Sequence, residues 1–337
     1  MNIKNKLYTS AGIAVILVVI GISVGVYQEQ TEKYTGPVEK ISIGATTQEL
    51  STLIWIAEEK GYFEENGLDV TVKAYDTGIE TKNALLAGEV DVADTVDFVI
   101  SGLGFEEADI KVLASINTAI IDYIIARKDR GISSLDDLKG KKIGIKRGSS
   151  AEYYLGRTLI LNNLSLQDVE LVAMHPPDMP EAIAQGKVDA TITWHPHNYH
   201  IKSSLGDNAI VWSAHGGQGV YWFVFCKDEF VQKYPEKIRR LLNALIQAEE
   251  FVRHDDSEAK EIIARRVNLD LPYIESVWSD FHFVVDLSQS MIIAMEDQAR
   301  WQINNNLTDA TKVPNYLYYI YMDALEKVKP EAIRIIR

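Results

Sequence analysis

Cysteine and positive charge are both scarce in this chain of 337 residues. The single cysteine, Cys226, excludes an intrachain disulfide. The apolar run 222–226 is typical of a buried strand, so we expect a structural thiol rather than a nucleophile. The 34 Lys and Arg residues are outnumbered by 48 Asp and Glu residues, and the formal net charge of −14 argues against nucleic acid as a partner.

Metal and cofactor signatures are missing from the sequence as well. His195, His197 and His200 are close together, but their spacing does not match a zinc site, and no cysteine or clear acidic ligand joins them. The sequence has no internal repeat and no low-complexity tract. We therefore expect no metal and no cofactor, and a globular chain long enough for one large domain or two lobes.

The longest uncharged apolar run stands at the N-terminus. Lys4 and Lys6 precede residues 7–27, which carry no charge and are long enough to cross a bilayer. The basic flank should stay in the cytoplasm. A cleaved signal peptide is the alternative, but no Ala-x-Ala cleavage site is present. We expect residues 1–37 to be a membrane anchor and tether, with the rest of the chain outside the cytoplasm.

Short apolar segments alternate with helical patterns over the first two thirds of the chain. This alternation is typical of an α/β architecture with largely parallel sheets. The expected strands are 40–45, 68–74, 90–93, 110–116, 123–126, 143–146, 169–172, 189–193 and 221–226. From about residue 228 the pattern becomes helical, with helices expected at 235–254, 257–266, 272–279, 288–304 and 316–327.

A tight turn, Gly148-Ser149-Ser150, lies between an expected strand and a helix over 151–161. Such a turn leaves the first N–H groups of the helix unpaired. Together with the helix dipole, these groups can bind a polar or anionic partner. A plain capping box is the alternative, because Ser149 and Glu152 have the required spacing.

Comparable turns follow other expected strands. Capping-box spacing recurs at Thr46 with Glu49 and at Thr77 with Glu80, and Asp94 opens a further expected helix. Ligands of parallel α/β sheets bind where strand ends and helix N-termini meet, so we expect these turns to surround one crevice.

Four segments, taken together, resemble a known family. They are residues 61–70, 87–93, 134–144 and 185–190. They are similar to the periplasmic-binding-protein group that serves ABC importers of nitrate, sulfonates, taurine and the pyrimidine precursor of thiamine. The resemblance covers roughly residues 38–306.

This resemblance implies a type II periplasmic-binding-protein fold. Each lobe would hold a mostly parallel sheet flanked by helices, with a helical C-terminal extension, and hinge closure would trap the ligand between the lobes. The lobes would be 38–125 with 221–337, and 126–220. Chain crossings are expected near 121–127 and 219–225.

Site positions of the family carry over to the turns of this chain and to the aromatic residue after the strand 189–193. The implied ligand-binding residues are Thr46, Thr47, Gln48, Asp76, Thr77, Gly78, Asp94, Thr95, Gly148, Ser149, Ser150 and Trp194. No catalytic residue is implied.

Four aspartates leave the charge of the ligand open. Asp76, Asp94, Asp97 and Asp122 stand near expected strand or helix ends, where caps and surface groups are common. If one or two of them face the crevice, they suit an amine or an amino-pyrimidine. Taurine carries both an ammonium and a sulfonate.

We therefore expect a non-catalytic receptor that delivers a small polar organic solute, sulfonate-, taurine- or nitrate-like, to an ABC permease and its ATPase. One alternative ligand is the thiamine-pyrimidine precursor. Another alternative is an enzyme resembling the pyrimidine synthase on the same fold. A membrane-tethered sensor would need an output domain, which the sequence does not show.

Overall fold

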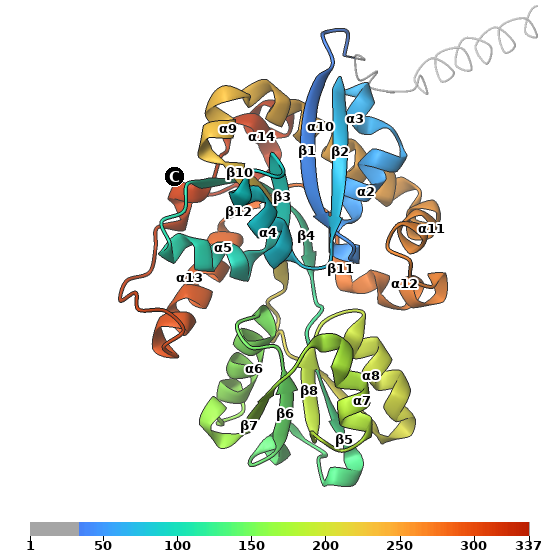
Figure 1. Ribbon diagram of the computed structural model, residues 1–337, viewed down its shortest axis with the longest axis vertical. Coiled ribbons are helices and arrows are strands. Elements are labelled where there is room, and N and C mark those ends of the chain that lie inside the picture. The colour runs from blue at the N-terminus through green and yellow to red at the C-terminus, as the bar shows by residue number, and fades with distance from the viewer. Residues whose placement is uncertain (1–33, 337) are drawn as a thin grey trace, which may run out of the picture. The chain divides into compact units, whose positions relative to one another are not determined.

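Two separate β-sheets organise the chain in the computed structural model, which describes residues 34–336 (Figure 1). Both sheets belong to the unit Gly36–Arg337. The expected anchor, residues 7–27, lies outside the described residues. Within the described part of the chain, no helix combines the length and apolar character that a membrane crossing requires.

The first sheet has six strands in the order β11-β4-β10-β3-β1-β2. Their bounds are β1 Glu39–Thr46, β2 Leu68–Tyr75, β3 Val92–Val96, β4 Ile110–Ala119, β10 Val220–Lys227 and β11 Phe281–His282. The second sheet has five strands in the order β7-β6-β8-β5-β9. Their bounds are β5 Tyr123–Arg127, β6 Lys142–Ile145, β7 Glu170–Ala173, β8 Ala190–Thr193 and β9 Ala209–Ser213. A further short sheet of two strands consists of β12 Leu287–Ser288 and β13 Ile333–Arg334.

Both sheets are mixed, but most strands of each run in one direction, as expected: β1 to β4 in the first sheet and β6 to β9 in the second. In the first sheet β1 runs parallel to β2 and β3, whereas β10 runs antiparallel to β3 and β4. In the second sheet β6 runs parallel to β7 and β8, whereas β5 runs antiparallel to β8 and β9. The antiparallel strands adjoin the two crossings, where the chain passes from one sheet to the other instead of returning through a helix.

The chain crosses between the sheets twice. The first crossing is residues 120–122, between β4 and β5, and the second is residues 214–219, between β9 and β10. We call the part built on the first sheet lobe one and the part built on the second sheet lobe two. The exact lobe boundaries, 125/126 and 220/221, stay a prediction.

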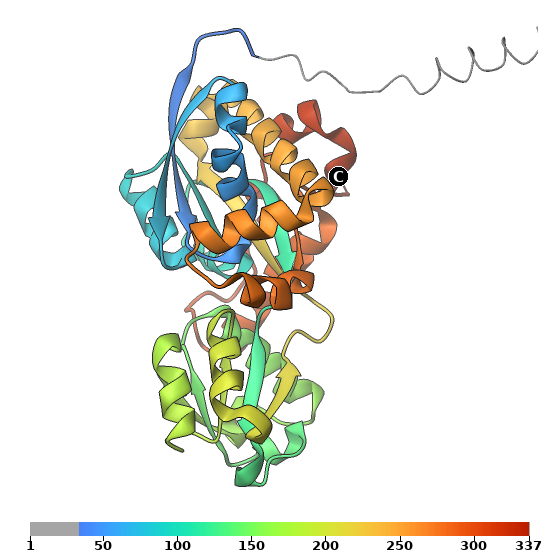
Figure 2. The same cartoon turned by 90° about the vertical axis from the view of Figure 1, so that its right-hand side faces the viewer.

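Helices cover both sheets (Figures 1 and 2). In lobe one they are α2 Thr52–Glu59, α3 Tyr62–Glu65, α4 Gly78–Ala87, α5 Asp97–Phe105, α9 Asp228–Lys233, α10 Pro235–His254, α11 Asp256–Arg266, α12 Leu271–Val277, α13 Gln289–Asn304 and α14 Asp323–Val328. In lobe two they are α6 Ser150–Leu161, α7 Met179–Ala184 and α8 His197–Leu205.

Helix α10 confirms the apolar stripe seen in the sequence. Ile238, Leu241, Leu242 and Leu245 are all buried, and each contributes roughly 1.5–3 kcal/mol. Pro235 occupies the first turn, where its missing N–H costs nothing.

The single helix expected over 316–327 is wrong. A 3₁₀ turn, Tyr316–Tyr319, is separated from α14 by an extended stretch. In that stretch Ile320 forms a bridge with Val112, and the Tyr321 N–H donates to the Val112 carbonyl at 2.9 Å. Pairing with β4 therefore replaces the helical hydrogen bonds there.

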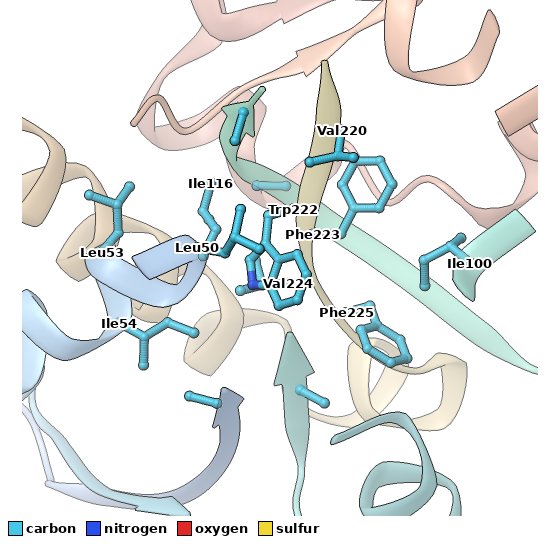
Figure 3. Packing of buried hydrophobic residues seen from close by; sticks show 14 of the residues in the cluster. Leu50, Leu53, Ile54, Ile100, Ile116, Val220, Trp222, Phe223, Val224 and Phe225 are labelled. Carbon is cyan, nitrogen blue, oxygen red and sulfur yellow. The ribbon is translucent and has the colours of Figure 1, made fainter. Parts of the chain in front are cut away.

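The core of lobe one is centred on β10 (Figure 3). Trp222 and Val224 point to the side where Leu50 lies, and Phe223 points to the other face of the strand. All these side chains are buried. Burial on both faces is expected for a central strand covered by helices on each side.

Candidate functional site

Two of the expected site residues, Asp94 and Thr95, lie inside a strand rather than in a loop. Both belong to β3 and pair with Val224 and Phe223 of β10. The helix expected to open at Asp94 begins at Asp97 instead. The expectation that Asp94 and Thr95 form a turn is therefore wrong, because the ladder with β10 extends the strand.

The Asp94 carboxylate is tied into lobe one. Its Oδ2 accepts hydrogen bonds from the Ser51 hydroxyl and from the Thr46 N–H, the latter at 3.3 Å. Burial raises the pKa of Asp94 to about 7. Thr46 is itself fully buried, and its hydroxyl lies 2.7 Å from that of Ser51. Thr46 and Asp94 thus connect the end of β1 to β3.

The turn after β2 is a helix cap. Thr77 and Glu80 form the predicted capping box at the start of α4, which confirms that reading. The Thr95 hydroxyl donates to the Gly78 carbonyl at 2.8 Å, and a Cβ at Gly78 would lie 2.6 Å from that hydroxyl oxygen, so only glycine fits. Asp76 is exposed.

The first expected turn lies beside this cap. The Thr47 N–H donates to the Tyr75 carbonyl at 2.9 Å. The Gln48 side chain donates to the Asp76 carbonyl at 2.9 Å. The turns after β1 and β2 are therefore brought together, as expected from the neighbouring parallel strands.

The turn before α6 holds a carboxylate of its own. The Gly148 N–H donates to Glu152 Oε2 at 2.7 Å, and Arg147 pairs with Glu152 at 3.0 Å. The Ser149 hydroxyl donates back to the Lys146 carbonyl at 2.7 Å, so the expected Ser149 cap does not form. A bound anion at this N-terminus would meet the charge of Glu152.

Trp194 is half-buried at the end of β8. Its ring stands edge-on to that of His197 with centroids 6.3 Å apart. Burial lowers the pKa of His197 to about 4, so this imidazole is neutral at pH 7. The same loop carries His195 and His200, and the described residues contain no group of three or more His, Cys, Asp or Glu side chains placed to hold a metal ion.

Asp122, one of the four aspartates weighed from the sequence, lies with Tyr154 where the lobes meet. We call this region the seam: the crossings 120–122 and 214–219 and helix α6 of lobe two, facing α5 and α13 of lobe one. Asp122 and Tyr154 are fully buried there. Within residues 34–336, both carboxylate oxygens of Asp122 and the Tyr154 hydroxyl lack a hydrogen-bond partner.

Two further observations place these groups close together. The Tyr154 ring lies 4.1 Å from the His215 ring, and His215 Nε2 lies 3.4 Å from Asp122 Oδ2. Burial raises the pKa of Tyr154 well above its ordinary value, and the charges of Asp97 and Asp122 raise it further.

Asp97, the first residue of α5, lies at the edge of the seam. Its carboxylate accepts from the Phe98 N–H at 2.8 Å and from the Tyr221 N–H at 3.3 Å. Burial raises the pKa of Asp97 to about 7. The side chain therefore reaches from α5 to the strand that follows the second crossing.

Aromatic rings connect the lobes next to these polar groups. Tyr153 of α6 lies 6.2 Å from Phe98 and 5.6 Å from Trp301 of α13, centroid to centroid. Gly156, one turn further along α6, permits the approach, because a Cβ there would lie 2.8 Å from Trp301 Nε1.

A polar contact joins the lobes through the loop after β8. His195 Nε2 lies 3.1 Å from Asp280 Oδ2, and the Tyr123 hydroxyl donates to the same oxygen at 3.0 Å. Asn198 Oδ1 lies 2.8 Å from His195 Nδ1, and its amide nitrogen donates to the Ile121 carbonyl. Both ring nitrogens of His195 thus face acceptors.

The arrangement offers hydrogen-bond acceptors and aromatic faces between two lobes joined by two crossings. Sequence reasoning missed Tyr153, Tyr154 and Trp301 because helical spacing of aromatic residues looks like ordinary core packing. The position of Asp122 between two expected strands was the one available signal.

Comparison with known proteins is consistent with this geometry. A family model described as NMT1/THI5 like matches residues 49–259. A protein of Brucella abortus (strain 2308), provisionally named a binding protein, is 28% identical over 229 residues, covering 66% of this chain and 69% of its own. A protein of Bacillus subtilis (strain 168), provisionally named an aliphatic sulfonates-binding protein, is 24% identical and covers 88% of this chain and 91% of its own.

Solved structures show the same fold. The periplasmic aliphatic sulphonate binding protein SsuA from Escherichia coli superposes with a TM-score of 0.73 at 20% identity, covering 85% of this chain and 98% of its own. At this identity the likeness concerns the fold alone.

Proposed function

Since the chain belongs to the NMT1/THI5 like family, we propose that it is an extracytoplasmic solute-binding protein of an ABC importer. In this role the lobes close on a small polar organic solute and hand it to a membrane permease with its ATPase. The curated relatives named above are described as binding proteins, which supports a receptor rather than an enzyme.

The observation that carries the proposal is the set of buried polar atoms at the seam. Leaving a buried donor or acceptor without a partner costs about 1–3 kcal/mol, and more for a charged group. The Asp122 carboxylate and the Tyr154 hydroxyl are such groups among the described residues. A solute held between the lobes would supply their missing partners.

The solute we propose is a small sulfonate of the taurine type. The sulfonate part follows the names of relatives in Bacillus subtilis and Escherichia coli. The amino part suits the acidic groups of the seam. The aromatic rings of Phe98, Tyr153 and Trp301 favour a second candidate, a flat amino-pyrimidine of the thiamine-precursor type.

We also propose Ser150 and Trp194, two of the residues expected from the sequence, as ligand contacts; because Glu152 lies at the start of α6, Ser150 would meet an uncharged or cationic part of the solute. Ser150 lies on the same helix as Tyr153 and Tyr154, less than two turns away. We expect the double variant Ser149→Ala, Ser150→Ala and the variant Trp194→Ala each to weaken solute binding. Unchanged affinity in either variant removes that contact from the site.

The test is to identify the molecule that the full chain carries after purification. Native mass spectrometry would reveal a bound small molecule, and incubation with taurine, ethanesulfonate or an amino-pyrimidine should raise the melting temperature while leaving the compound unchanged. Conversion of a compound into product would favour the pyrimidine-synthase-like enzyme. If no molecule is carried and no compound raises the melting temperature, the proposed receptor function is contradicted.

Residues 7–27 are proposed to anchor the protein in the cell membrane, which would keep it close to its permease. The support is the uncharged run with a basic flank. N-terminal sequencing of the protein extracted from membranes with detergent tests this. A chain starting near residue 28 would show cleavage instead.

A further inference from the structure

We propose that the solute carries a positively charged nitrogen group, an ammonium or amidinium, which binds between Asp122 and Asp97 at the seam. This inference rests on the proposed receptor function and adds the charge of its ligand. It assigns Asp122 as the residue that selects the cation, Tyr154 as a hydrogen-bonding partner, and the neighbouring aromatic rings as the wall of the site.

Asp122 carries a buried carboxylate. Its side chain is 0% exposed, lies in the first crossing, and both of its oxygens lack a hydrogen-bond partner within residues 34–336. Asp94 also has one unpartnered oxygen but accepts two hydrogen bonds at its Oδ2, and Asp137 accepts four from Ser133 and Ser134, whereas Asp122 accepts none. A buried carboxylate keeps its charge only when a cation or several donors face it.

His215 is not that cation. Its Nε2 accepts the N–H groups of Ile121 at 3.1 Å and Asp122 at 2.9 Å. Its Nδ1 lies 2.9 Å from the Gln218 carbonyl, to which it donates. An imidazole that accepts at Nε2 and donates at Nδ1 is neutral, so the contact of 3.4 Å with Asp122 is not an ion pair.

Arg157 is a cation near the seam. Its guanidinium binds the Gln218 side chain and lies 3.4 Å from the Tyr153 hydroxyl. No ion pair between Arg157 and an acidic side chain is present among the described residues. Its charge is therefore directed to neutral partners and leaves the Asp122 carboxylate uncompensated.

Tyr154 and the neighbouring aromatic rings would supply the ligand's other contacts. The Tyr154 hydroxyl is fully buried and, in the described structure, unpartnered, so it can donate to or accept from a guest. The Tyr153 ring lies 5.0 Å from the Tyr154 ring, centroid to centroid, and packs against Phe98 and Trp301. Aromatic faces attract cations, and a desolvated cation gains most from them.

The charge balance then decides between ligand classes. An anion at the seam would add a third negative charge to Asp97 and Asp122 in a buried setting, which is strongly unfavourable. A cation would pair with Asp122 by charge-assisted hydrogen bonds, which are roughly twice as strong as neutral ones. A zwitterion such as taurine fits when its ammonium points to Asp122.

The experiment compares matched probes by isothermal titration calorimetry with the full chain in detergent. Taurine is paired with isethionate, which has a hydroxyl in place of the ammonium, and benzamidine is paired with neutral benzamide. Ethanesulfonate serves as the plain anion. We expect the cationic member of at least one pair to bind ten times more tightly, or more, than its partner.

The variant Asp122→Asn keeps the shape of the side chain and removes its charge. It should reduce the preference for the cationic probe to threefold or less without lowering the melting temperature of the unliganded protein. The control is Asp286→Asn, a buried aspartate that pairs with Arg334 outside the seam, and it should leave the preference unchanged. Tyr154→Phe should weaken the binding of the cationic probe and of isethionate to the same extent.

Each outcome is decisive. The proposal is overturned when no cationic probe outbinds its partner, or when Asp122→Asn keeps the wild-type preference. Tight binding of ethanesulfonate or isethionate with no cation preference would contradict the proposed positive charge of the ligand. The proposed receptor function would remain supported. Absence of binding by every probe, with no molecule carried through purification, would overturn both.

Discussion

At the scale of single residues, buried aspartates carry most of the unusual chemistry. Burial raises the pKa of Asp94 and Asp97 to about 7, although each accepts hydrogen bonds from two groups. Desolvation of the charged form outweighs these hydrogen bonds. Asp94 braces lobe one, whereas Asp97 reaches the seam.

The raised pKa of Asp94 makes stability depend on pH. An unfolded aspartate titrates near 3.8 and the folded one near 7, so between these values the folded state binds more protons. The contribution of Asp94 to the free energy of unfolding therefore falls as pH rises from about 4 to 7. Between pH 5 and pH 8 this loss is about 3 kcal/mol.

We expect Asp94→Asn to remove that loss. Urea unfolding at pH 5 and pH 8 would show a smaller difference in the variant than in the wild type. Asp76→Asn is the control, because Asp76 is exposed. An Asp94→Asn variant with the wild-type pH dependence would show that the buried carboxyl stays ionised throughout.

At the scale of secondary-structure elements, α6 of lobe two packs on α13 of lobe one. Gly156 and Trp301 form the close approach, and Tyr153 lies between Phe98 and Trp301. A glycine at that helix position costs about 1 kcal/mol of helix propensity relative to alanine. Glycine is nevertheless required at this position, because a side chain there would hold α6 and α13 apart.

We expect Gly156→Ala to weaken binding of the solute by fivefold or more while raising the stability of α6. The new Cβ would lie 2.8 Å from Trp301 Nε1, closer than real contacts allow, so α6 and α13 must move apart. The matched control is Gly102→Ala in α5, where a Cβ meets nothing within 4 Å among the described residues. Calorimetry with taurine or the identified solute, beside thermal unfolding, measures both effects. Equal affinity in the two variants would contradict the prediction.

The loop after β8 makes a second contact between the lobes, through His195, Asp280 and Tyr123. Hydrogen bonds to charged groups contribute about 1.5–3 kcal/mol. We therefore expect His195→Ala to lower solute affinity roughly tenfold or more, because we propose that this contact stabilises the lobes in the arrangement that holds the solute. His200→Ala, an exposed histidine on the neighbouring helix, should have no effect. Matching affinities for the two variants would show that the contact does not favour closure.

At the scale of the whole molecule, both crossings pass through the seam. Residues 120–122 and 214–219 are joined by His215, which accepts from Ile121 and Asp122 and donates to Gln218. This hydrogen bonding fixes the crossings to each other, so lobe movement should rotate about them as a unit.

Solute binding should close the lobes. We expect small-angle X-ray scattering to give a smaller radius of gyration with the solute than without it, and the change should be reduced in Gly156→Ala. A solute at 100 times its Kd stabilises by about 2.7 kcal/mol, which raises the Tm by a few degrees. A Tm rise without any change in the radius of gyration would mean that the solute binds to lobes that are already closed.

The sequence by itself determined the elements whose signals are local. The stripe of α10 and the capping box of Thr77 with Glu80 follow from spacing of three and four residues, and both formed as expected. The alternation of strands and helices indicated the α/β class. The loop assignment of Asp94 failed because pairing with β10, more than 120 residues away, lengthened β3.

Only the tertiary structure decided which polar groups share the seam. Asp122, Tyr154 and His215 are separated by 32 and 61 residues, and nothing local marks them as neighbours. They come together because the two crossings place α6 of lobe two against α13 of lobe one. The cluster therefore depends on how the lobes pack. Likewise the start of α6 has the local pattern of an anion site, but the fold places the carboxylate of Glu152 there.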